Sequence, residues 1–187
     1  MQRLPTVLLA LFLCAWAAPL VEARRGDELQ ARRDAIDTMA VETMQRLFSE
    51  APATKDLYSR AAGFAVFDNF KVSLLLSGAG GVGVAVDRKS GKHTYMKSGG
   101  GGLGLGLGGH SYQLVVLFET QSALERFVAK RWQVDAAASA VAGTSGKATA
   151  ATFTEGIAVF QMTNKGLVAQ ADVTGTRYWR AKALNGN

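Results

Sequence analysis

Cysteine and histidine are nearly absent from this chain of 187 residues, and each absence argues against a class of protein. The one cysteine, Cys14, lies in an apolar stretch at the start, so no disulfide can form within the rest of the chain and its core must come from packing. The two histidines, His93 and His110, have no partners at the spacing of a metal site. The chain also lacks the Gly-x-Ser-x-Gly and His-Glu-x-x-His motifs. The sequence therefore predicts a protein that is not an enzyme and holds no metal or cofactor, and a hydrolase with an unrecognised site ranks last.

Residues 1–23 have the three parts of a secretory signal peptide. Arg3 is followed by an apolar stretch over residues 4–20 and by small residues up to Ala23, after which we expect cleavage. A membrane anchor is the alternative, but a spanning helix needs about 20 apolar residues, and this stretch is shorter and contains two prolines. Acylation of Cys14 as a lipoprotein is disfavoured by the bulky Leu13 before it. We expect an exported protein that is periplasmic, secreted or associated with the cell envelope.

Basic residues outnumber acidic residues by 21 to 15, so the net charge is +6. Cleavage after Ala23 would remove one of each kind and leave 164 residues with the same charge. This length suits one domain with its own core. An exported domain with this charge favours anionic partners such as phospholipid head groups, and export disfavours nucleic acid.

An amphipathic helix is predicted over residues 27–48. Apolar residues recur there at intervals of three, four and seven, and the opposite face mixes acidic and basic side chains. A mixed face is typical of a helix packed on its own domain, whereas a membrane-inserted helix would be richer in Lys and Arg. Pro52 ends this helix, and residues 55–62 form one or two further turns.

The rest of the chain is rich in short apolar runs separated by turn residues, which predicts strands. Residues 87–91 form a hairpin connection, with Gly91 placed for a left-handed conformation. Thr120, Ser122 and Glu125 provide a cap and a capping box for a helix that extends through Trp132. The expected fold is α+β: a curved or barrel-like antiparallel sheet with the N-terminal helix and one or two further helices packed on it. The strands are expected at 63–67, 72–76, 82–86, 92–96, 99–109, 112–118, 156–163 and 167–173, with a turn between two further strands within 136–151 and a final segment at 176–180.

Two glycine-rich segments need separate interpretation. Residues 99–109 alternate leucine with glycine, so one strand face is bare backbone, which either packs against a neighbouring element or accepts a lipid. Residues 78–83 match the dinucleotide-binding pattern G-x-G-x-x-G. A strand and a hairpin follow them in place of the required helix, and no acidic residue lies between Arg88 and Gln113, so this site is rejected.

Four segments in this order resemble the SYLF domain family over about Tyr58 to Tyr178. The resemblance implies lipid binding, and it implies that Lys71 and Lys165 contact lipid head groups. Asp68 departs from the pattern, because the family often has proline there. The matching segments are residues 62–67 with Lys71 after them, 80–83, 102–109 and 164–167.

The leading hypothesis is an exported, non-catalytic protein that binds anionic phospholipid or a membrane surface. Further basic residues that could contact head groups are Arg88, Lys89, Lys130 and Arg131, each worth on the order of 1 kcal/mol near an anionic membrane. The alternative is a structural or protein-partner-binding envelope protein whose basic charge is incidental. The expected organisation is a signal peptide at 1–23, a helical segment at 24–57, a SYLF-like β-rich domain at 58–181 and a flexible tail at 182–187.

Overall fold

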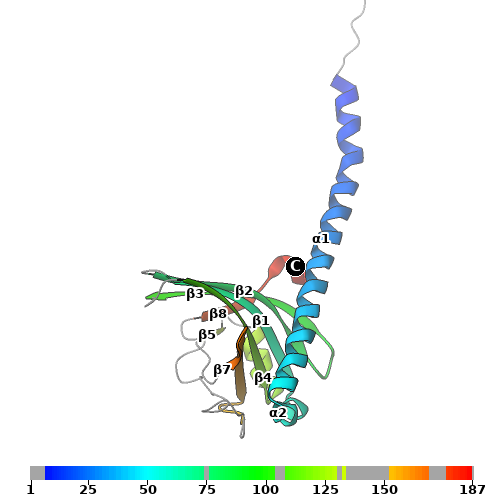
Figure 1. Cartoon of the computed structure of the whole chain (residues 1–187). Helices are drawn as coiled ribbons and strands as arrows, with labels where there is room; N and C mark the ends of the chain where they lie inside the picture. The colour runs from blue at the N-terminus through cyan, green and yellow to red at the C-terminus, as the bar shows by residue number, and fades with distance from the viewer. Residues whose placement is uncertain are drawn as a thin grey trace, which may run out of the picture.

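The computed structural model describes residues 7–73, 76–103, 108–129, 132–133, 152–168 and 176–186. Within them, eight antiparallel strands form one curved sheet in the order β5-β8-β3-β2-β1-β4-β6-β7 (Figure 1). The expected α+β class with a curved antiparallel sheet is confirmed. The helices are α1 (Val7–Glu50), α2 (Thr54–Arg60), α3 (Gln121–Ala129) and α4 (Lys182–Asn185); the strands are β1 (Gly63–Ser73), β2 (Leu76–Asp87), β3 (His93–Leu103), β4 (Gly108–Phe118), β5 (Trp132–Gln133), β6 (Ile157–Thr163), β7 (Gly166–Val168) and β8 (Thr176–Arg180).

The central strands are longer than the sequence predicts. The runs expected at 63–67 and 72–76 are not separate strands, because β1 continues from Gly63 to Ser73 and β2 begins at Leu76. β1 pairs along its whole length with both β2 and β4, so its backbone groups find partners on both sides even where the side chains are polar. The glycines of 78–83 lie inside β2, which agrees with the rejection of a dinucleotide site.

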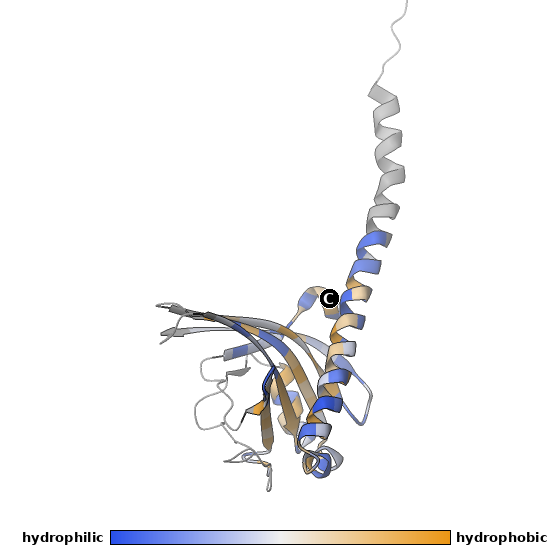
Figure 2. Ribbon diagram, in the orientation of Figure 1, coloured by the Kyte–Doolittle hydropathy of each residue, from blue (hydrophilic) through white to orange (hydrophobic). Residues whose placement is uncertain are grey.

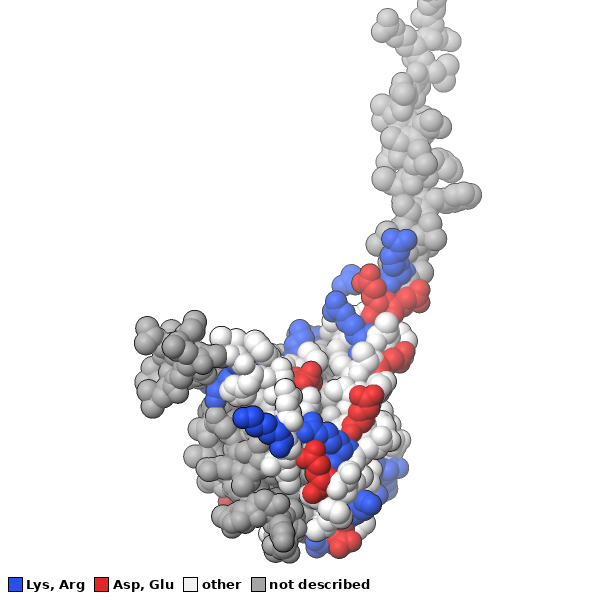
Figure 3. Space-filling model, in the orientation of Figure 1, with Lys and Arg blue, Asp and Glu red and all other residues white. Residues whose placement is uncertain are grey.

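The two faces of the sheet carry separate cores. α1 packs on one face, where its buried residues Ile36, Ala40, Met44 and Leu47 recur every three or four positions (Figures 1 and 2). α3 packs on the other face, and its Phe127 ring lies 6.0 Å from that of Phe67 on β1. The prediction that the N-terminal helix packs on its own domain is confirmed. Both acidic and basic side chains lie on the side of α1 that Figure 3 shows.

The helix expected to reach Trp132 ends earlier. α3 stops at Ala129, and Trp132 belongs to β5, where it pairs with Tyr178 of β8. The cap is where the sequence places it, because the backbone N–H of Ala123 donates to the Thr120 hydroxyl at 3.2 Å.

The C-terminal segment differs from the flexible tail expected at 182–187. Residues 182–185 form α4, and its Leu184 is buried against the α1 core. The Asn185 side chain accepts from the backbone N–H of Tyr95 at 2.9 Å and donates to the Tyr95 carbonyl at 2.8 Å. These two bonds join α4 to the backbone of β3 at Tyr95 and hold the C-terminal segment in place.

Several expectations concern residues outside the described ones. They are the turn within 136–151, the segment after Val168 up to Val173, and the leucines at 105 and 107. In the part of the chain that the structure describes, no helix is both long and apolar enough to cross a membrane.

Candidate functional site

The basic residues expected to contact lipid do not share one surface. Lys71 lies near the end of β1, opposite Ala79 of β2, whereas Arg88 and Lys89 lie in the turn that follows the other end of β2. Nine residues of strand separate Ala79 from Arg88, a distance of about 30 Å at about 3.4 Å per residue. Lys71 and this turn therefore lie at opposite ends of the sheet.

Arg88 holds the backbone of the adjoining helix. Its Nη1 donates to the carbonyls of Tyr58 and Ala61 at 2.7 Å each, and its guanidinium lies 4.4 Å from the centre of the Tyr58 ring. The last carbonyls of a helix have no intrahelical partner, so a cation placed there stabilises the end of α2.

Of the remaining predicted residues, the structure describes Lys165. Lys165 is exposed in the turn between β6 and β7, near the C-terminal end of α1, where Arg46 Nη2 donates to the Thr163 carbonyl at 2.5 Å. Lys130 and Arg131 lie outside the described residues.

The sheet presents a second surface that the sequence analysis did not identify. Three large apolar side chains are exposed on it: Phe70 at 51%, Val72 at 40% and Val82 at 41%. Val82 pairs with Asp68, and residues 68, 70 and 72 of β1 share one face because side chains alternate along a strand. This is the face that α1 covers, since Val66 and Val84 on it belong to the α1 core. Beyond α1 the same face continues without a cover among the described residues.

Glycines leave part of this surface as bare backbone. A Cβ at Gly78 would meet nothing within 4 Å, and one at Gly80 would meet only the Ser98 carbonyl at 3.9 Å. The opposite face of β2 is packed, because a Cβ at Gly83 would lie 2.6 Å from the Phe67 ring. Glycines of β2 are therefore packed against a side chain on one face of the strand and uncovered on the other.

A tryptophan, a lysine and the exposed carboxylate of Asp68, which pairs with Val82, also lie on this surface. Lys97 of β3 pairs with both Val82 and Trp179, and it is exposed. The half-buried Trp179 ring covers Gly99, where an added Cβ would lie 2.8 Å from Trp179 Cη2. We name this surface the open face and define it by Phe70, Val72, Val82, Lys97 and Trp179.

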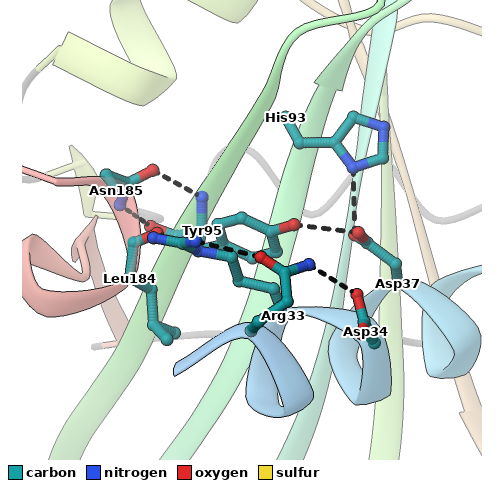
Figure 4. Close-up of polar contacts among 8 residues, drawn as sticks. Arg33, Asp34, Asp37, His93, Tyr95, Leu184 and Asn185 are labelled. Carbon is teal, nitrogen blue, oxygen red and sulfur yellow. Dashed lines mark hydrogen bonds and ion pairs between the residues drawn. The ribbon is translucent and has the colours of Figure 1, made fainter. Parts of the chain in front are cut away.

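The position of α1 decides how much of the sheet stays open. Asp37 of α1 accepts from the Tyr95 hydroxyl at 2.8 Å and lies 3.0 Å from His93 Nδ1, and Arg33 donates to the Leu184 carbonyl at 2.8 Å (Figure 4). Desolvation by burial, together with the Asp37 contact, raises the pKa of Tyr95 to about 12. Bonds from β3 and α4 thus fix α1 in one place, and Figure 1 shows β2 and β3 continuing past it.

The described residues offer no metal centre. Among them, no cluster of three or more His, Cys, Asp or Glu side chains is placed to hold a metal ion. Hydrogen bonds from the Gln121 amide and from the Ser90 backbone N–H lower the pKa of the Asp87 carboxyl group to about 2. This carboxylate shapes the turn after β2, because its Oδ1 accepts from the N–H groups of Lys89 and Ser90.

Comparison with known proteins assigns the family. Residues 99–187 match the family model Ysc84, described as "Las17-binding protein actin regulator". The chain carries a Ysc84 (SYLF) domain. It is also 45% identical over 152 residues to Beta cell expansion factor A of Aeromonas veronii. That alignment covers 81% of this chain and 58% of the relative, so the Ysc84 chain spans little more than half of the relative's length.

The family match confirms the resemblance stated from the sequence. The matched region includes two of the four segments that carry it, residues 102–109 and 164–167, and it ends beyond β8. Of the five residues that define the open face, Trp179 lies in the matched region, and the other four precede it on β1, β2 and β3.

Proposed function

We propose that this protein binds the surface of anionic phospholipid membranes, without catalysis, through the open face. The observation that carries the proposal is the exposure of Phe70, Val72 and Val82 together on one side of the sheet. Contiguous exposed apolar side chains mark a surface that contacts a partner or a membrane.

The chemistry of the open face suits the boundary between lipid and water. Burying apolar surface contributes about 25 cal/mol per Å². Trp179 has an amphipathic ring of the kind that collects at membrane interfaces. Lys97 adds on the order of 1 kcal/mol near anionic head groups. The net charge of +6 attracts the chain to such a surface from a distance.

The proposal keeps further basic residues as head-group contacts outside the open face. They are Lys71, Lys89, Lys130, Arg131 and Lys165. Because Lys71 and the turn at 88–89 lie at opposite ends of β2, one membrane contact would engage only some of them. Lys71 lies between Phe70 and Val72 along β1, but side chains alternate along a strand, so its side chain is on the opposite face of the sheet from theirs. Arg88 is the least suited, since its guanidinium already binds the backbone of α2.

Export is part of the proposal. It rests on the signal-peptide pattern of residues 1–23, with cleavage near Ala23 and with a lipoprotein at Cys14 as the disfavoured alternative. The proposed location is the periplasm or the cell envelope, or outside the cell.

A protein partner is the second candidate. The description of the family names a protein that binds Las17, and the open face could equally dock on a protein surface. On that reading the basic charge is incidental, and binding would not depend on lipid charge.

Vesicle sedimentation separates the two candidates. Residues 24–187 are mixed with neutral and anionic vesicles at low and high salt. The membrane proposal predicts sedimentation with anionic vesicles, weakened by salt and weakened at least tenfold by Phe70→Asp. Val41→Asp is the matched control, because Val41 is 56% exposed but lies on α1, outside the open face. Absence of binding to any vesicle would favour the protein partner.

A further inference from the structure

A cleft lies on the side of the sheet that α3 covers, opposite the open face. It has a volume of about 290 Å³ and lies between α3, the adjoining ends of β2 and β3, and Arg180 of β8. Ala85 of β2 lines it and belongs to the core beneath α3, which fixes the face of the sheet. Such a volume is just below the range for drug-sized ligands, so the cleft suits a smaller molecule.

The lining of the cleft carries charges of both signs. Two carboxylates, Asp87 and Glu125, and two cations, Lys92 and Arg180, border it, so their charges cancel. Among the described residues, no ion pair joins one of these carboxylates to one of these cations. Opposite charges that share a space without pairing leave room for a ligand that carries both.

The four charged groups differ in how far they are already engaged. Both oxygens of Asp87 accept hydrogen bonds from within the protein, and Lys92 lies directly opposite it, where the Asp87 N–H donates to the Lys92 carbonyl at 3.0 Å. Glu125 Oε1 accepts from the Gln121 amide at 3.3 Å, and its Oε2 has no partner among the described residues. The Arg180 side chain makes no hydrogen bond or ion pair within that part of the chain. Glu125 and Arg180 are therefore the pair available to a ligand.

Thr94 adds a buried hydroxyl at the base of the cleft. This residue is 4% exposed and lines the cleft, and its hydroxyl makes no hydrogen bond to a described residue. Arg180 pairs with Met96, two residues along β3 from Thr94, so the hydroxyl and the guanidinium lie on the same face of the sheet. A hydroxyl withdrawn from water is costly without a partner, and a polar ligand in the cleft supplies one.

We propose that this cleft binds a small aliphatic α-amino acid such as leucine. The planar guanidinium of Arg180 suits the carboxylate, to which the Thr94 hydroxyl donates, and the Glu125 carboxylate binds the ammonium group. The aliphatic side chain packs on Leu124 and Val128 of α3, which line the same space. A ligand with one charge would leave the opposite charge of the lining without a partner, whereas a zwitterion matches both.

The test is isothermal titration calorimetry of the full chain with L-leucine, for which saturable binding at one site is expected. N-acetyl-L-leucine lacks the ammonium group and L-leucinamide lacks the carboxylate, so each should bind at least tenfold more weakly. Glycyl-L-leucine carries the two charges further apart and should be weakened as much, which distinguishes a free amino acid from a peptide.

Substitutions assign the binding to the cleft. Arg180→Gln and Glu125→Gln should each weaken leucine binding at least tenfold. Arg126→Gln and Glu119→Gln are the matched controls, because they remove exposed charges that do not line the cleft, and they should leave binding unchanged.

Thr94→Val keeps the shape of the side chain and removes only the hydroxyl. It should weaken leucine binding about threefold to tenfold, the value of one hydrogen bond. The thermal unfolding of the ligand-free chain should not suffer, because the hydroxyl has no bond within the described residues to lose.

The outcomes separate this site from the membrane contact. Glu125→Gln should still sediment with anionic vesicles, and Phe70→Asp should still bind leucine, since no residue of the open face lines the cleft. Absence of saturable binding, equal affinity for L-leucine and N-acetyl-L-leucine, or unchanged binding by Arg180→Gln and Glu125→Gln would overturn the proposal.

Discussion

Single residues in this protein have their roles set by which face of the sheet they occupy. Gly83 and Gly80 belong to the same strand, three residues apart, and have opposite surroundings. Gly83 allows the Phe67 ring to lie against the backbone, and that ring packs 4.7 Å from Tyr178 in the core beneath α3. Gly80 faces open space on the other side.

The same substitution at these two glycines should therefore have very different effects on stability. Gly83→Val should lower the free energy of unfolding by about 2 to 3 kcal/mol, because the added Cβ overlaps Phe67 and overpacks the core. Gly80→Val adds the same side chain where a Cβ would meet only the Ser98 carbonyl at 3.9 Å, and it should change stability little. Urea unfolding of both variants measures the difference, and equal losses would contradict this account of β2.

Asp87 gives the protein a specific acid sensitivity. Its pKa in the folded state is about 2, below the ordinary value of 3.8, so the carboxylate stabilises the fold above about pH 4. That contribution is lost as the pH falls from about 4 towards 2, where the carboxylate becomes protonated.

Asp87→Asn should therefore flatten the stability profile between pH 4 and pH 2 and lower stability at neutral pH. Thermal unfolding across this range measures both effects. Glu119→Gln is the control, because it removes an exposed carboxylate and leaves Gln121, Lys89 and Ser90, the donors to Asp87, unchanged. If Asp87→Asn loses as much stability between pH 4 and pH 2 as the unchanged chain does, another carboxylate causes that loss.

At the scale of elements, hairpins and packed helices could be predicted from the sequence, but strand lengths could not. Periodicity located α1, and Gly91 has the expected left-handed backbone with φ of 68°. The glycine-rich segment 78–83 looked like a break between strands, because glycine has no side chain to mark a face. It is continuous strand because β1 and β3 pair with it on both sides.

The open face could not be predicted from the sequence either. Residues 68–71 fall between the strands expected at 63–67 and 72–76, so the sequence assigned no face to Phe70. In the structure they belong to β1, where Asn69 is buried at 3% exposure and Phe70 is exposed at 51%. The exposure of Phe70 depends on where α1 crosses the sheet, which is a tertiary property.

The short helix α4 offers a test at the element scale. Asn185→Ala removes three hydrogen bonds that join α4 to Tyr95 and to Ala181, and it should destabilise the fold by about 1 to 2 kcal/mol. Lys182→Ala changes an exposed residue of the same helix and should have little effect. If chemical unfolding showed no difference between the two variants, α4 would be a loosely attached tail after all.

At the scale of the whole molecule, α1 covers part of one face of the sheet and leaves the open face uncovered among the described residues. Mixed charges cover the outer side of α1, so this helix shields the sheet rather than offering a uniformly basic surface (Figure 3). The central claim is that the uncovered part of the sheet, and not α1, contacts the membrane.

Site-specific labelling tests this claim most directly, because Cys14 is the sole cysteine and lies within residues 1–23. Residues 24–187 carrying Val82→Cys or Val41→Cys are labelled with an environment-sensitive dye and mixed with anionic vesicles. We expect a blue shift and a rise in emission for the label at position 82, and no change for the label at 41. A shift at 41 with none at 82, in protein that sediments with the vesicles, would contradict the claim that the open face contacts lipid.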